Sequence, residues 1–273
     1  MSGVLAGLEE NGIDPRECGG FVGSSAGSIV AASLAGGVSP SSRLGELPEQ
    51  PPVDPAEDGG TPGLLRRVAE AAGAPIASLA LSWATPGGAL VRRLALARVP
   101  EGKRSLGGLG RSFKQLGVDW DGRLRIAAVE VESGRRVVFG APGAPGLPVA
   151  DAVLASCAIP GVFRPVRFDG RTYVDCGAWS PTNMDGADVS RGDSVLCLNP
   201  TATAGALGPV SRSIAAAETL VLKRRGATVK VLNPDDAAAQ AMGSNLMRQS
   251  GRSEVIAAGL AQGRRLAIAT SQA

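Results

Sequence analysis

Apolar and polar positions along the chain follow two spacings, one typical of helices and one typical of strands. Apolar residues at helical spacing predict helices at residues 3–8, 28–34, 64–72, 105–116, 148–157, 210–225 and 253–269. Short apolar runs predict strands at residues 18–22, 194–198 and 227–232, and hairpins at 123–140 and 162–174. Strands that alternate with helices are typical of layered α/β folds with a largely parallel sheet.

One region departs from this alternation. Residues 39–63 are rich in Pro, Gly, Glu and Asp, a composition that predicts a loop. The following residues 75–99 mix a Pro-Gly-Gly turn with an apolar, Arg-bearing stretch. Long irregular insertions in a compact domain often act as lids. We therefore expect a single domain over residues 1–273, with a variable, lid-like insertion around 39–116.

The net charge of the chain indicates which classes of binding partner to expect. The chain has 28 Lys and Arg against 25 Asp and Glu, a net charge of +3. A nucleic-acid-binding domain is usually clearly basic with a basic stripe, so we expect no nucleic-acid partner. The arginine pairs at 66–67, 92–93 and 224–225 are interpreted as solvated helix faces. Aromatic residues make up only 3% of the chain, so small aliphatic residues must fill the core.

The cysteine and histidine content points away from a metal site. Because the chain has no histidine and no C-x-x-C spacing, the usual zinc ligand sets are excluded and we expect no metal or cofactor. Free thiols in a reducing compartment are expected at Cys18, Cys157, Cys176 and Cys197. The first residues resemble neither a signal peptide nor an anchor, and no run of about 18 apolar residues occurs. We expect a cytoplasmic protein, with peripheral contact at a membrane left open.

The stretch GFVGSSAGSIVAA contains a serine between two glycines at the spacing G-x-S-x-G. This spacing, between a predicted strand and a predicted helix, is typical of a serine nucleophile on a sharp turn. Gly23 and Gly27 would let the backbone approach closely there, leaving the Ser25 hydroxyl exposed. The alternative interpretation is that Ser25 only caps the following helix.

A serine nucleophile needs a base, and the absence of histidine excludes a Ser-His-Asp triad. Among the carboxylates, Asp175 follows a β-like run, Arg171 to Val174, and precedes Gly177 on a tight turn. Ligand chemistry in α/β sheets gathers at such strand ends, and burial would raise the proton affinity of the carboxylate. The alternative is an Asx turn, in which Asp175 only bonds its own backbone.

Several segments together resemble the patatin-like phospholipase family. They are GVLAGLEENGI, VGSSAGSIVAA, RLRIAAVEVESGRRVVFG and ADAVLASCAIPGVFRPVRFDGRTYVDCGAWSPTN. The resemblance implies a three-layer α/β/α fold and a lipid ester substrate cleaved without metal or cofactor. It also implies a dyad of Ser25 as nucleophile and Asp175 as base, with Gly177 on the dyad turn.

The sequence departs from the family pattern at two places. Cys176 stands where the family has the first glycine after the aspartate. The chain also begins inside the helix that follows the family's first strand and glycine-rich oxyanion loop, so we expect a truncated start. The Ala26 N–H is then the one oxyanion donor expected here, and each such donor is worth about 100- to 1000-fold in rate. A weakly active or inactive member that binds lipid or a partner is therefore the alternative to a hydrolase, and acyl transfer to another alcohol would use the same residues.

Overall fold

The computed structural model describes residues 1–42, 44, 88–243 and 251–271. Most of the expected loop at 39–63, the helix expected at 64–72 and much of the lid-like insertion lie outside the described residues. The helices are α1 (Ser2–Glu9), α2 (Ala26–Ala35), α6 (Gly88–Ala97), α7 (Gly107–Leu116), α8 (Val149–Cys157), α9 (Gly208–Arg224), α10 (Asp236–Met242) and α11 (Arg252–Ser271). The strands are β1 (Phe21–Ser24), β2 (Leu124–Glu130), β3 (Arg135–Phe139), β4 (Val166–Phe168), β5 (Arg171–Asp175), β6 (Ser194–Leu198) and β7 (Thr228–Leu232).

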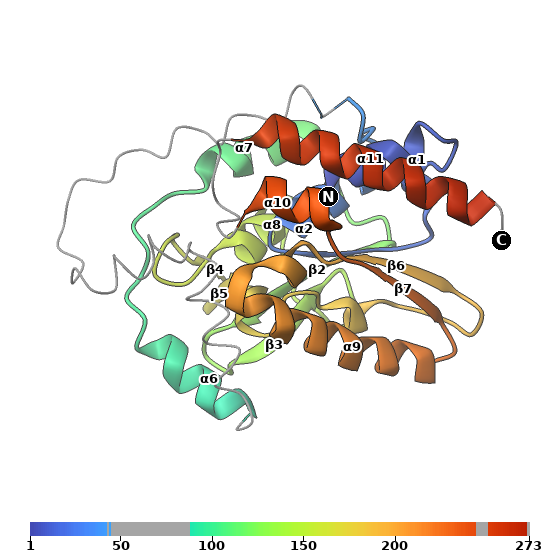
Figure 1. Cartoon of the computed structure of the whole chain (residues 1–273). Coiled ribbons are helices and arrows are strands. Elements are labelled where there is room, and N and C mark those ends of the chain that lie inside the picture. The colour runs from blue at the N-terminus through green and yellow to red at the C-terminus, as the bar shows by residue number, and fades with distance from the viewer. Residues whose placement is uncertain (43, 45–87, 244–250, 272–273) are drawn as a thin grey trace.

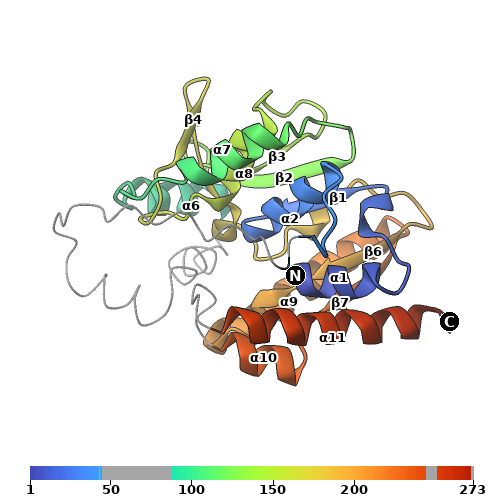
Figure 2. The same cartoon turned by 90° about the horizontal axis from the view of Figure 1, so that it is seen from above.

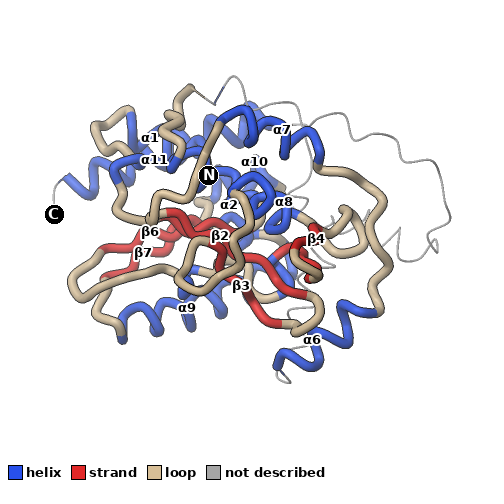
Figure 3. Tube along the Cα trace, turned by 180° about the vertical axis from the view of Figure 1, so that it is seen from behind, coloured by secondary structure: helices blue, strands red, loops and turns tan. Residues whose placement is uncertain are grey.

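The described strands form two sheets, and neighbouring strands are parallel in some pairs and antiparallel in others. The larger sheet has the order β1-β2-β5-β4, with β3 also paired to β2, and β6 pairs with β7 in a second sheet. Pairing is parallel at β1–β2 and β6–β7, and antiparallel at β2–β3, β2–β5 and β4–β5. Figure 3 shows the strands as a band between helices. The fold is therefore α/β, as expected, with a mixed sheet in the part described.

Helices cover both sides of the strands. In Figure 1, α1, α2, α8, α10 and α11 lie above the strands and α9 lies below them. Figure 2 shows α2, α7 and α8 gathered over the larger sheet, and α1, α10 and α11 beside them. Fully buried residues of the core include Leu124, Ile126, Phe139 and Tyr173, and the last two rings meet edge to face at 5.2 Å. This core holds the ends of β1 and β5 in place.

The first and last helices pack closely because each carries glycines four residues apart. A Cβ added to Gly7 would lie 2.4 Å from the Leu260 carbonyl oxygen, and one added to Gly263 would lie 2.1 Å from the Val4 carbonyl oxygen. Only glycine allows backbones to approach this closely. The contact joins the two ends of the chain beside the sheet.

Several local expectations need correction. The strand expected at 18–22 is β1, which lies further along the chain than expected. It covers Phe21–Ser24 because these residues pair in register with Leu124 to Ala127. No helix was predicted at α6 or α10, and both are present. For α10, Asp235 caps the helix by accepting a hydrogen bond from the Ala238 N–H at 2.9 Å.

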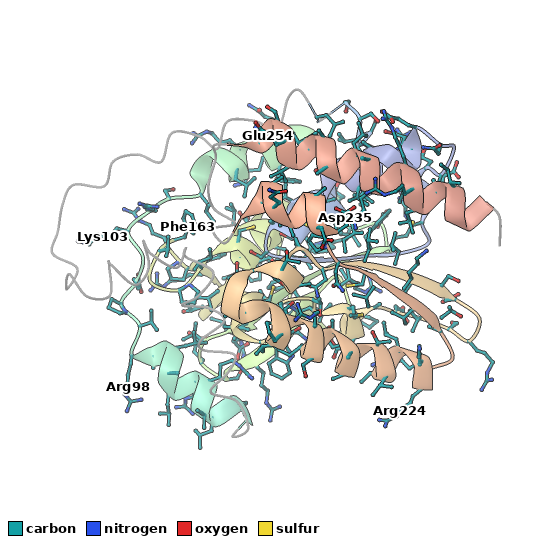
Figure 4. All side chains as sticks on the ribbon, viewed as in Figure 1. Arg98, Lys103, Phe163, Arg224, Asp235 and Glu254 are labelled. Carbon is teal, nitrogen blue, oxygen red and sulfur yellow. The ribbon has the colours of Figure 1, made fainter. Side chains whose placement is uncertain are left out.

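The interpretation of the arginine pairs as solvated faces is wrong for Arg92, which is only 4% exposed. Its guanidinium lies 4.2 Å from the centre of the Trp179 ring and donates to the carbonyls of Ala178 and Gly134. Arg224 is exposed, like Arg98 just after α6 and Glu254 on α11 (Figure 4). Residues 66–67 lie outside the described part. No described helix is both long and apolar enough to span a membrane.

Candidate active site

Ser25 lies on a strained turn between β1 and α2. Its backbone has φ 50° and ψ −125°, a conformation that non-glycine residues adopt only when the surrounding structure enforces it. Gly23 makes this turn possible, because a Cβ there would lie 2.4 Å from the Ser28 Cα. A Cβ on Gly27 would meet nothing within 4 Å. The close approach of the strand end to α2 therefore requires a glycine at position 23, whereas a side chain at position 27 would meet no neighbouring atom.

The strain at Ser25 should be measurable by comparing two substitutions that both remove the hydroxyl. Because glycine adopts positive φ without a Cβ clash, we expect Ser25→Gly to exceed Ser25→Ala in free energy of unfolding by about 1 kcal/mol. Urea unfolding of the two variants at one pH measures the difference. Equal stabilities would contradict a strained turn.

The Ser25 side chain does not cap the helix. Although Ser25 occupies the N-cap position of α2, its hydroxyl makes no capping hydrogen bond. The hydroxyl instead donates to Asp175 Oδ2 at 2.7 Å. The capping interpretation left open by the sequence therefore does not hold for this side chain.

Asp175 is the last residue of β5, and its two carboxylate oxygens have different partners. Oδ1 accepts the Gly177 backbone N–H at 2.7 Å, which is the turn interaction considered above. Oδ2 accepts the Ser25 hydroxyl. The turn bond orients the carboxylate, and the second oxygen is directed at the serine. The structure therefore brings Ser25, Asp175 and Gly177 together.

The burial of Asp175 sets its proton affinity. The residue is 2% exposed, and this burial raises the pKa of its carboxyl group to about 6, although the hydrogen bonds from Ser25 and Gly177 act in the opposite direction. Above pH 6 the group is thus mainly a carboxylate, with a proton affinity closer to neutrality than an exposed aspartate has. A carboxylate in this state, hydrogen-bonded to a serine hydroxyl, is suited to accept its proton.

The sequence did not predict Ser156 beside the pair, nor the contact that Cys176 makes there. Ser156, at the end of α8, accepts the Ser25 backbone N–H on its hydroxyl at 2.9 Å. The Cys176 thiol lies 3.1 Å from the Ser24 hydroxyl, and burial raises the pKa of this thiol. Cys176 therefore fits into the turn after Asp175, with its sulfur against the Ser24 hydroxyl on the turn that carries Ser25. No local pattern signals these contacts, because the partners are more than a hundred residues apart.

A groove of about 1880 Å³ opens beside the pair and includes Ser25, Asp175 and Ala26 in its wall. Much of the remaining wall is apolar, and it includes Ile29, Leu34, Leu109, Ile159, Phe163 and Leu196. Ala26 is exposed and is the first residue of α2, where a backbone N–H has no acceptor within its own helix. The groove therefore combines a serine, a buried carboxylate and an apolar surface.

Within residues 1–42, 88–243 and 251–271, no three His, Cys, Asp or Glu side chains are grouped so that they could hold a metal ion. The four cysteines are free, and Cys18 is the exposed one.

The fold and this site define an α/β protein with a serine on a strand-to-helix turn beside a buried carboxylate. Residues 71–188 match the family model for Patatin-like phospholipase, which supports the resemblance to the patatin-like family over this part of the chain. The matched range includes Asp175 but begins after Ser25. A comparison with curated proteins found no match. The patatin-like domain suggests a lipid acyl hydrolase.

Proposed function

We propose that this protein is a serine lipid acyl hydrolase that cleaves ester bonds of phospholipids or acylglycerols with Ser25 and Asp175. The observation that carries the proposal is the 2.7 Å hydrogen bond from the Ser25 hydroxyl to a buried carboxylate. The apolar wall of the groove suits an acyl chain, which would gain free energy by leaving water. The family match supports a lipid substrate.

The proposed reaction proceeds through an acyl-enzyme. Asp175 Oδ2 accepts the Ser25 proton while Ser25 Oγ attacks the ester carbonyl carbon. The proton then passes to the leaving alcohol, and the acyl group stays on Ser25. A water molecule gives its proton to Asp175 and attacks the acyl carbon, and Ser25 regains a proton as the fatty acid leaves. In this scheme the Ala26 N–H donates to the developing oxyanion.

A fluorophosphonate probe tests the proposal, because its phosphorus reacts with an activated serine and releases fluoride. We expect covalent labelling at Ser25, located by peptide mass spectrometry. Since the base must be ionised, the labelling rate should rise with pH through about 6 and then level off. A rate that does not change between pH 5 and pH 8 would contradict Asp175 as the base.

The second candidate function is binding of lipid or a partner with little or no catalysis. It is favoured by Cys176, which stands where the family pattern has the first glycine after the aspartate. Folded protein that the probe does not label would support this candidate. Acyl transfer to an alcohol would show the same labelling, and it is distinguished by ester product formed when an acceptor alcohol is added.

Peripheral contact with a membrane is proposed through α6. This helix exposes Leu90, Val91 and Leu94, and Arg93 on the helix and Arg98 just after it are also exposed. Apolar side chains beside cations are suited to the surface of an anionic bilayer. The cytoplasmic location expected from the sequence remains a prediction.

A further inference from the structure

Asn183 makes contacts that the dyad itself does not explain. Its side chain is completely buried, and its backbone is left-handed with φ 52°. The amide nitrogen Nδ2 donates to the Ser180 carbonyl at 2.6 Å and to the Ser24 hydroxyl at 3.1 Å. The amide oxygen accepts from Arg136 at 3.4 Å. All the hydrogen-bonding atoms of this amide therefore have partners, which sets its orientation.

The loop that carries Asn183 is anchored on several sides. The Ser180 hydroxyl accepts the Asn183 backbone N–H at 3.1 Å. Glu218, from α9, accepts the Met184 N–H at 2.9 Å, and Arg136, from β3, pairs with Asp185. Since these anchors come from separate elements, the amide is presented from a firmly held position.

The contact with Ser24 reaches both turns of the proposed dyad. Ser24 immediately precedes Ser25, and its hydroxyl lies 3.1 Å from the thiol of Cys176, which immediately follows Asp175. By donating to Ser24 Oγ, Asn183 leaves the Ser24 hydroxyl hydrogen free to point at the Cys176 sulfur. The amide, hydroxyl and thiol thus form a second link between the two turns, beside the direct Ser25–Asp175 bond.

We propose that Asn183 is a positioning residue that, through Ser24 and Cys176, holds the Ser25 turn against the Asp175 turn. This inference rests on the proposed function. Small displacements of reacting groups lower rates strongly, so such a link affects the chemical step more than substrate binding. Asn183 acts at a distance from the substrate and is not itself a catalytic residue.

The test compares the fluorophosphonate labelling rate of Asn183→Gly, Ser24→Ala and the double variant. Glycine tolerates the left-handed backbone, so Asn183→Gly removes the amide without straining the loop. We expect each single variant to label about tenfold more slowly, equivalent to about 1.4 kcal/mol, and the double variant to be no slower than the slower single variant. Asn183→Asp, which keeps the side-chain shape, replaces Asn183→Gly if that variant does not fold.

Structural damage to the loop predicts a different result. If Asn183 only stabilised the loop, the two effects would multiply in the double variant, which would overturn the proposal. Wild-type labelling by Asn183→Gly would also overturn it while leaving the proposed function intact. The control is Ser33→Ala in α2, whose buried hydroxyl donates to the Ile29 carbonyl and not to the Asn183 loop, and this variant should label at the wild-type rate. An equal loss in this control would overturn a role specific to Asn183. Absence of labelling in the wild-type protein would instead overturn the proposed function, and the positioning role with it.

Discussion

Replacing Ser25 with alanine is expected to lower kcat for ester hydrolysis by at least about a thousandfold, because the variant has no oxygen to carry the acyl group. The hydrogen bond from the Gly177 N–H to Asp175 Oδ1 does not involve the Ser25 hydroxyl, so the variant should still fold. Release of p-nitrophenol from a short-chain ester measures the chemical step. Release of fatty acid from phospholipid vesicles measures it on a lipid surface.

A matched control for Ser25→Ala is available in α2, the helix that follows Ser25. Ser33 is buried, and its hydroxyl donates to the Ile29 carbonyl rather than to a carboxylate. Ser33→Ala should therefore keep the wild-type kcat. Hydrolysis by purified Ser25→Ala at the wild-type rate would rule out Ser25 as the nucleophile.

Replacing Asp175 with asparagine is expected to abolish hydrolysis and yet stabilise the fold at neutral pH. Burial raises the pKa of this carboxyl group from 3.8 to about 6, so the folded state binds its proton more tightly than the unfolded state. The ionised group then opposes folding above pH 6, by about 3 kcal/mol for a shift of this size. Asparagine carries no charge and retains an oxygen that can accept the Gly177 N–H.

The stability difference between Asp175→Asn and the wild-type protein should depend on pH. The penalty is fully present above pH 6, declines as the pH falls from 6, and is absent below the unfolded value near 3.8. The stability advantage of Asp175→Asn in urea unfolding should therefore be largest at pH 8 and shrink toward pH 4. Asp119→Asn, at an exposed carboxylate, is the control and should change stability by less than about 0.5 kcal/mol. An Asp175→Asn protein that is less stable than wild type at pH 8 would contradict a buried, ionised carboxylate.

Local patterns predicted most of the described elements but could not predict how a buried charge is accommodated. The hairpin at 123–140 was found because its strands and its Gly134 turn are contiguous in the chain. Arg92 was misjudged because an arginine pair usually marks a solvated surface. Its partners, the Ala178 carbonyl and the Trp179 ring, lie far along the chain and become neighbours only on folding.

The sequence by itself determined the two candidate groups. A serine framed by glycines between a strand and a helix, and an aspartate at a strand end, are short-range features that follow from local backbone geometry. The tertiary structure decided the 2.7 Å approach of Ser25 to Asp175, the burial that raises the aspartate pKa, and the contacts of Ser156, Cys176 and Asn183. These depend on the packing of β1, β5 and α8 against one another. Distances and desolvation arise from segments far apart in the chain, and no local pattern contains them.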